Sequence, residues 1–304
     1  MNKVSRETDL RRQKLSTNPI QDSASTMYVC PDCRSPLVGL RCEQCACAFP
    51  CLFGYPKLLP NGPGFASARG VVDAYEEIYA EHANVWENQG RSKEFIRYFA
   101  GILNSFQPRR ILEVGCGEGL VLAASDAAEK HATELSVRAL QVSNARTQAQ
   151  FSLALCERLP YSDAAFDLVT SVGVMEHFLD DHAATREIFR VLDAGGRYVL
   201  LIHVHLTPLQ SLRQKVSEYI FPRPRPLGLA RWLVGKLHKP IHQPVQNNYS
   251  IDSATACLND AGFVVERRIT KASAPKAPLI GPHVVIFVCR KTAMPSAVAK
   301  ESLV

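Results

Sequence analysis

The sequence has no uninterrupted apolar run of about 18 residues, the length that a membrane-spanning helix requires. Its polar start also lacks the apolar centre of a secretory signal, so we expect a cytoplasmic protein. Residues 1–26 contain no aromatic side chain and mix acids with bases. Because such a segment buries too little apolar surface to offset its lost conformational entropy, we predict a disordered arm there. A second tail, at 292–304, is expected to fray.

Excess charge is also small, and its position tells more than its size. The 304 residues carry a net charge of +6, and a basic insert at 208–244, with seven Lys or Arg and one acid, accounts for all of it. A helix is predicted at 227–237 within the insert. One side of this helix is apolar and includes Trp232, whereas Arg231 and Lys236 are displaced from that side. This pattern is typical of a helix lying on an anionic membrane, or of a lid over a hydrophobic acceptor. A helix that packs on its own domain with solvated charges has the same pattern.

Cysteine is abundant in one place only, since six of the ten cysteines lie within residues 27–60. Four of them form two C-x-x-C pairs separated by eight residues, namely Cys30, Cys33, Cys42 and Cys45. Two such turns can present four thiolates to one tetrahedral zinc ion, whereas disulfides are disfavoured in the cytosol. We therefore predict a structural zinc ribbon at 27–60, folded with help from its metal. Cys47 and Cys51 fall outside the pairs, and Cys51 is expected to be a buried free thiol.

A glycine-rich turn organises the remainder of the chain. An apolar run from Ile111 to Val114 predicts a strand, and Gly115, Gly117 and Gly119 follow at alternate positions before another apolar run that predicts a helix. The spacing differs from the G-x-G-x-x-G of folds that bind a pyrophosphate. A ligand with a ribose but no diphosphate fits better. Glu134 stands where a second strand is expected to end, the position from which an acid reaches ribose hydroxyls.

These residues resemble motif I of the class I S-adenosylmethionine (SAM)-dependent methyltransferases, in particular the type 11 group that modifies small molecules and lipids. Four later stretches follow the order of that family: the loop at 156–161, a strand at 166–169, motif IV at 171–178, and a helix, turn and strand at 190–200. The resemblance covers roughly residues 71–290. It implies a domain at 71–291 built on a doubly wound Rossmann-like α/β sheet, with SAM at the carboxyl ends of the strands.

The resemblance also implies which residues surround the cofactor. Leu155 stands where the family usually carries an Asp for the adenine amino group, so the backbone of Cys156 and the acid of Glu157 are the expected substitutes. The alternative for Glu157 is a solvated carboxylate in a loop, with no role in adenine recognition. The backbone at Ser171 and Val172 is expected to border the sulfonium and the methionine amine. The full expected set is Glu113, Gly115, Cys116, Gly117, Gly119, Glu134, Leu135, Cys156, Glu157, Ser171, Val172 and Tyr79.

The first segment of the domain, residues 71–105, is predicted to be helical, because apolar and aromatic residues recur at steps of three and four. In similar enzymes this segment lies over the cofactor. Tyr79 and Trp86 are therefore candidates to cover the methionine end of SAM. Aromatic residues at this spacing also fit a role in the core.

Motif IV bears on the type of reaction. It lacks the Asp or Asn followed by two prolines that is typical of nucleobase N-methylation. His177 is the candidate catalytic residue, because histidine can take a proton near neutral pH; the alternative is that Glu176 and His177 only cap the next helix. We expect methyl transfer to oxygen or carbon of a small-molecule, lipid-linked or glycan-precursor acceptor. An rRNA or tRNA methyltransferase, with the basic insert on phosphates, and a non-catalytic SAM-fold scaffold are the two alternatives.

Overall fold

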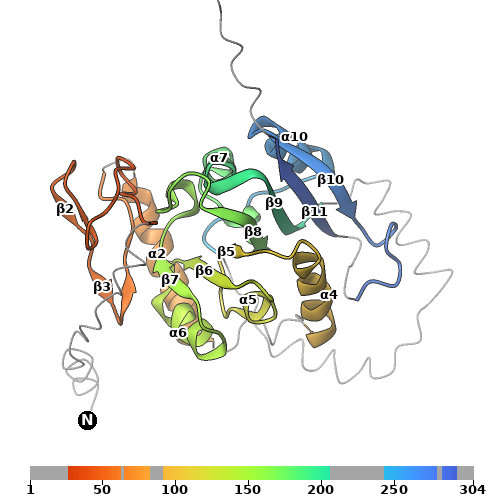
Figure 1. The fold of residues 1–304 in the computed structure, drawn as a ribbon. Helices are drawn as coiled ribbons and strands as arrows, with labels where there is room; N and C mark the ends of the chain where they lie inside the picture. The colour runs from red at the N-terminus through yellow and green to blue at the C-terminus, as the bar shows by residue number, and fades with distance from the viewer. Residues whose placement is uncertain (1–26, 63–64, 83–91, 206–242, 279–282, 293–304) are drawn as a thin grey trace, which may run out of the picture.

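The computed structural model describes residues 27–62, 65–82, 92–205, 243–278 and 283–292 (Figure 1). Four predicted features lie outside these residues: the arm at 1–26, Trp86, the basic insert up to residue 242, and the tail beyond residue 292. Within the described residues, no helix has both the length and the apolar character to span a membrane.

A seven-stranded sheet forms the centre of the molecule, in the order β10-β11-β9-β8-β5-β6-β7. Five neighbouring strands from β9 to β7 are parallel, whereas β11 runs antiparallel to both β9 and β10. The strands are β5 (Arg110–Val114), β6 (Glu129–Glu134), β7 (Gln150–Leu153), β8 (Phe166–Val172), β9 (Leu192–His203), β10 (Phe263–Ile269) and β11 (Val284–Lys291). This confirms the predicted doubly wound sheet.

Helices cover both faces of the sheet. Neighbouring residues of β5 belong to two different buried clusters, Ile111 on one face and Leu112 on the other, because successive strand residues point to opposite sides. Helices α4 (Lys93–Asn104), α5 (Leu120–Ala123) and α6 (Val137–Arg146) bury side chains on the face of Ile111. Helices α7 (Asp181–Val191) and α10 (Ile251–Asp260) bury theirs on the face of Leu112. The central strands are therefore buried on both faces, as is usual for parallel strands between two layers of helices.

The helix expected at 71–105 is two helices in the structure. Helix α2 covers Ala66–Glu81, and α4 begins after residues 83–91, which lie outside the described part. Ser92 starts α4, because its side chain accepts a hydrogen bond from the Phe95 amide at 3.3 Å. Ser250 caps α10 in the same way, through the Ser253 amide at 3.0 Å.

The cysteine-rich segment folds as two short hairpins, β1 (Arg41–Cys42) with β2 (Cys47–Ala48) and β3 (Cys51–Leu52) with β4 (Tyr55–Pro56). It shares a buried cluster with the domain, where Tyr28 packs against Tyr161 with ring centroids 5.4 Å apart. The chain after β4 runs parallel to the end of β7, and the Leu58 amide donates to the Leu153 carbonyl at 2.8 Å. This ribbon therefore covers an edge strand that would otherwise expose unpaired backbone groups.

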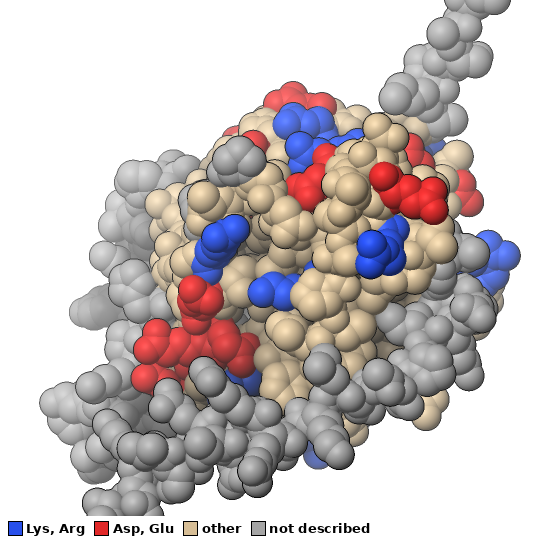
Figure 2. Space-filling model, turned by 90° about the vertical axis from the view of Figure 1, so that its left-hand side faces the viewer, with Lys and Arg blue, Asp and Glu red and all other residues tan. Residues whose placement is uncertain are grey.

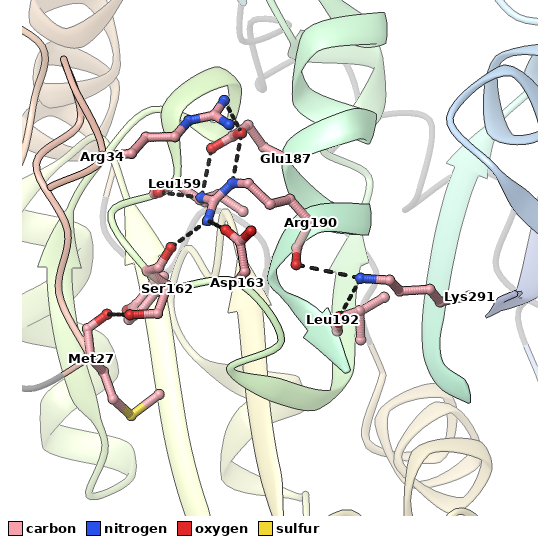
Figure 3. A network of polar contacts seen from close by, with 10 residues as sticks. Met27, Arg34, Leu159, Ser162, Asp163, Glu187, Arg190, Leu192 and Lys291 are labelled. Carbon is pink, nitrogen blue, oxygen red and sulfur yellow. Dashed lines mark hydrogen bonds and ion pairs between the residues drawn. The ribbon is translucent and has the colours of Figure 1, made fainter. Parts of the chain in front are cut away.

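An arginine at the end of α7 joins the ribbon to the domain (Figure 3). Arg190 donates to both carboxylate oxygens of Glu187, to the Tyr161 and Leu159 carbonyls, and to Asp163. Glu187, whose side chain is 4% exposed, also accepts from Arg34 of the ribbon at 2.6 Å. Burial lowers the pKa of Arg190, but its hydrogen bonds to Glu187 outweigh burial and the net shift is upward.

We expect Arg190→Met to destabilise the protein by about 3 kcal/mol, because it leaves the buried carboxylate of Glu187 with one partner and several carbonyls with none. Arg186→Met, an exposed position on the same helix, is the matched control and should cost no more than about 0.5 kcal/mol. Guanidinium-induced unfolding measures both. Equal stability of the two variants would contradict this role for Arg190.

Candidate functional site

The main pocket lies where the parallel strands end, and it encloses about 690 Å³ of empty space including its open mouth. Strands β5, β6, β7 and β8 each contribute the residues that follow their carboxyl ends, and α2 closes the opposite side. The expected cofactor residues that line it are Tyr79, Gly115, Gly117, Glu134, Leu135, Cys156, Glu157 and Val172. Open α/β sheets bind ligands at this edge.

The glycine turn is hydrogen-bonded to the end of β6. All three glycines of the turn have positive φ angles, between 52° and 68°, a conformation that favours glycine. Glu134 accepts hydrogen bonds from the Gly117 amide at 2.8 Å and the Leu135 amide at 2.7 Å. Burial raises the pKa of Glu134, against the lowering effect of these amides. The carboxylate thus lies at the pocket wall beside the turn. This is the position from which the sequence analysis expects it to bind ribose hydroxyls.

Three of the expected cofactor residues do not line the main pocket. They contact the helices next to the glycine turn instead. Glu113 accepts from the Leu122 amide at 3.0 Å and so positions α5. A Cβ on Gly119 would lie 2.1 Å from the Ser143 hydroxyl oxygen, so this position needs close approach to α6. Cys116 is buried near the same hydroxyl. These contacts support the turn, and direct contact of the three residues with the cofactor stays a prediction.

The wall after β7 contains Leu155, Cys156 and Glu157. Glu157 is not a solvated carboxylate: it is 7% exposed and accepts from the Leu179 amide at 2.7 Å and the Asp180 amide at 3.3 Å. Burial raises its pKa. Glu157 therefore ties this wall to the segment that follows motif IV, in addition to lining the pocket.

Motif IV divides between the pocket and the core. Val172 lines the pocket, but Ser171 is fully buried and its hydroxyl lies 2.7 Å from that of Tyr198. Successive residues of a strand face opposite sides, so the side chain of Ser171 belongs to the core, and the expected contact of its backbone with the cofactor stays a prediction. The sequence pattern alone did not separate the two.

His177 lies on the pocket wall with one ring nitrogen fixed. Its Nδ1 is 2.6 Å from the Val245 carbonyl oxygen, and because a carbonyl can only accept, Nδ1 carries the proton and Nε2 of the neutral ring is a proton acceptor. Asp180, not Glu176 or His177, caps α7, through the Ala183 amide at 2.8 Å. The capping alternative is therefore wrong for both residues.

Glu176 instead forms hydrogen bonds to the last residue of β9. Its Oε1 accepts from the backbone amide and from Nδ1 of His203, the latter at 2.9 Å. Its Oε2 is buried without a hydrogen-bond partner among the described residues. Burial raises the pKa of Glu176, but the bonds from His203 outweigh it and the pKa falls below its ordinary value.

Helix α2 supplies a stripe of side chains one turn apart, Val71, Tyr75 and Tyr79, that lines the pocket. The hydroxyl of Tyr75 donates to Gln243 Oε1 at 3.1 Å, so α2 is tied to the end of the basic insert. Burial, with the nearby carboxylate of Glu134, raises the pKa of Tyr75 and keeps it neutral. Sequence reasoning did not assign Tyr75 or Gln243 to the site. The four-residue spacing was the available signal for Tyr75, and no signal pointed to Gln243.

The charge of the pocket suits a cation. Glu134 and Glu157 are the acids among its lining residues, and no Lys or Arg of the described residues lines it. SAM carries a sulfonium and an ammonium against one carboxylate, so it is a net cation. Opposite charge in a partly desolvated site favours binding. The pocket therefore fits the cofactor that the glycine turn suggested.

The four paired cysteines of the ribbon come together as expected. One ligand atom from each of Cys30, Cys33, Cys42 and Cys45 lies within 4.8 Å of the other three. The sulfurs of Cys33 and Cys42 are 3.4 Å apart, and the Cys45 amide donates to the sulfur of Cys42 at 3.3 Å. Four clustered thiols with amide donors fit a structural zinc site. Cys51 is not in this cluster, whereas Cys47 lies near Cys30 and Asp32. The two are partly exposed, so the prediction of a buried thiol at Cys51 is not met.

We expect one zinc ion per chain, lost in Cys42→Ser because a hydroxyl is a poor replacement for a zinc-bound thiolate. Cys51→Ser removes a cysteine of the same ribbon and should keep the metal. Elemental analysis of the purified variants measures the zinc content. A folded wild-type protein without metal, or loss of zinc in Cys51→Ser, would contradict the assignment.

Glu134→Ala should weaken binding of S-adenosylhomocysteine roughly 10- to 100-fold, the usual effect of losing hydrogen bonds to a charged group. Glu129→Gln, at the opposite end of the same strand, is the control and should bind normally. Isothermal titration calorimetry measures both. Because burial raises the pKa of Glu134 above 4.5, affinity should also decline as the pH falls from neutrality through the raised value. Unchanged affinity in Glu134→Ala would remove this residue from the site.

Comparison with known proteins shows what the domain that carries this site is similar to. Residues 112–200 match the family described as "Methyltransferase domain". The chain is 27% identical over 187 residues to ajmaline N-methyltransferase of Rauvolfia serpentina, covering 49% of this chain and 64% of that protein. It is 31% identical over 151 residues to ubiquinone biosynthesis O-methyltransferase of Alkalilimnicola ehrlichii, covering 45% and 58%. The alignments thus span less than two thirds of each relative.

A solved structure supports the same fold. The crystal structure of Burkholderia thailandensis 1,6-didemethyltoxoflavin-N1-methyltransferase, with bound 1,6-didemethyltoxoflavin and S-adenosylhomocysteine, superposes with a TM-score of 0.52 at 16% identity. The match covers 77% of this chain and 92% of that one. In its sheet order, its glycine turn and residues 112–200, the chain is similar to the class I SAM-dependent methyltransferases.

Proposed function

We propose that the protein transfers the methyl group of SAM to an oxygen or carbon atom of a small-molecule, lipid-linked or glycan-precursor acceptor. The observation that carries the proposal is His177 at the pocket wall, with Nδ1 held by the Val245 carbonyl and Nε2 available as a base. Two relatives, ajmaline N-methyltransferase and ubiquinone biosynthesis O-methyltransferase, are named for small-molecule pathways, which supports a small molecule as the acceptor.

The reaction is a direct displacement in which the acceptor nucleophile forms a bond to the methyl carbon as the carbon–sulfur bond breaks. Bound SAM supplies the electrophilic methyl group. His177 takes the proton of the acceptor hydroxyl or activated carbon at Nε2, and Tyr75 and Tyr79 exclude water from that side of the pocket. Glu134 binds the ribose. Alignment of this kind is worth several kcal/mol when the geometry is close to that of attack.

RNA is the less favoured acceptor. A protein that binds RNA through its phosphates is expected to have a cluster of basic residues on its surface. On the described part of the face that carries the ribbon, Lys and Arg are separate residues with acids among them (Figure 2). The excess positive charge of the sequence lies instead in the basic insert, beside the apolar side that includes Trp232. We propose that the insert meets an anionic membrane peripherally or covers the acceptor, in a cytoplasmic protein.

Transfer of a radiolabelled methyl group from SAM tests the function and the acceptor class together. The purified protein is incubated with cell extract separated into small molecules, lipids and RNA, and the label in each fraction is counted. Label in small molecules or lipids supports the proposal. Label in RNA alone overturns it in favour of the RNA methyltransferase, and no label in any fraction despite SAM binding favours the scaffold.

His177→Ala should lower the rate of labelling about 10²- to 10⁴-fold, because it removes the proton acceptor, while binding of S-adenosylhomocysteine stays nearly intact. His182→Ala, an exposed histidine on α7, is the matched control and should retain full activity. An unchanged rate in His177→Ala would show that this imidazole is not the base.

A further inference from the structure

A second cavity lies between the ribbon and the first turns of α2. It holds about 890 Å³ of empty space, part of which is open to solvent. The residues after β4 form one wall and α2 forms the other. We refer to it as the ribbon cavity. Its walls come from three parts of the chain: the ribbon, the start of α2 and the residues after β7.

The walls of the ribbon cavity are apolar, with cations among the residues that line it. Phe49, Ala68 and Leu155 are almost fully buried and form its floor together with Phe65. Lys57 is partly buried as a residue, and its side chain makes no hydrogen bond or ion pair with any other described residue. Its ammonium group can therefore pair with a ligand anion.

The remaining charges at the cavity leave a net positive balance. Arg69 lies on α2 and, like Lys57, has no ionic partner among the described residues, whereas Asp73 is the acid among the lining residues. Two cations against one acid favour an anionic ligand. The apolar floor favours one with an aromatic or aliphatic body.

Helix α2 is the partition between this cavity and the main pocket. Ala68 and Val72 line the ribbon cavity, whereas Val71 and Tyr75 line the main pocket. Leu155 lines both. A ligand that fills the ribbon cavity must therefore contact the helix whose opposite side closes the main pocket.

We propose that the ribbon cavity is an effector site for a small amphipathic anion, an apolar or aromatic body with a carboxylate, sulfonate or phosphate group, and that its occupation tightens binding in the main pocket. The ligand holds α2 against the ribbon and so keeps Tyr75 and Tyr79 at the pocket wall. The coupling, though not the site, rests on the proposed use of SAM. Coupling between sites is reciprocal, so S-adenosylhomocysteine and the effector should strengthen one another by about fivefold or more.

The probe is 8-anilinonaphthalene-1-sulfonate, an aromatic sulfonate whose fluorescence rises in apolar sites. It is titrated into the full chain with S-adenosylhomocysteine present at saturation, so that the main pocket is filled. Ala68→Leu fills the cavity and should abolish saturable binding of the probe, and Lys57→Gln should weaken it about tenfold. Ala80→Leu, exposed on the same helix, and Arg41→Gln, on the ribbon, are the matched controls and should bind normally.

The outcomes separate this proposal from the proposed function. Probe binding that depends on Lys57 and Ala68 supports the site, and a fivefold lower probe affinity without S-adenosylhomocysteine supports the coupling. Binding that neither variant changes, or that S-adenosylhomocysteine displaces, overturns the site. If Ala68→Leu fails to fold, Lys57→Gln decides. Failure of S-adenosylhomocysteine to bind by calorimetry in the absence of the probe overturns the proposed function and the coupling, but not the site.

Discussion

The parallel pairing of β5 with its neighbours β6 and β8 is the constraint on which the site depends. Parallel strands that lie side by side end at one edge of the sheet, so the glycine turn, Glu134 and motif IV meet there although they are far apart in sequence. The hydrogen bond from the Gly117 amide to Glu134 then locks the turn to the end of β6. Fold and pocket are thus set by the same backbone pairing.

The ribbon extends that arrangement at the edge of the sheet. The Leu58 amide bonds to Leu153, and the chain leaving Leu153 forms the pocket wall that contains Cys156 and Glu157. Arg190 holds the loop that follows, at Leu159 and Tyr161, and is joined through Glu187 to the ribbon (Figure 3). A zinc-dependent ribbon would therefore stabilise one wall of the cofactor pocket as well as itself.

Local pattern predicted the sheet, the turn, the place of Glu134 and the four clustered cysteines, because each of these depends on short-range spacing or on a resemblance carried by contiguous residues. Contacts between distant segments were not predictable in this way. The bonds of Glu157 to the chain after motif IV, of Glu176 to His203 and of Tyr75 to Gln243 depend on the final packing. The direction of a side chain at the end of a strand also escaped the pattern, as Ser171 and Glu113 show.

The central claim is that the main pocket binds SAM through the glycine turn and Glu134, and a crystal structure of the protein with S-adenosylhomocysteine tests it most directly. The account predicts the ribose hydroxyls within hydrogen-bond distance of Glu134, the adenine beside Leu155 and Cys156, and the sulfur on the side of the pocket that contains His177. A ligand bound elsewhere, or one whose ribose makes no contact with Glu134, would contradict it.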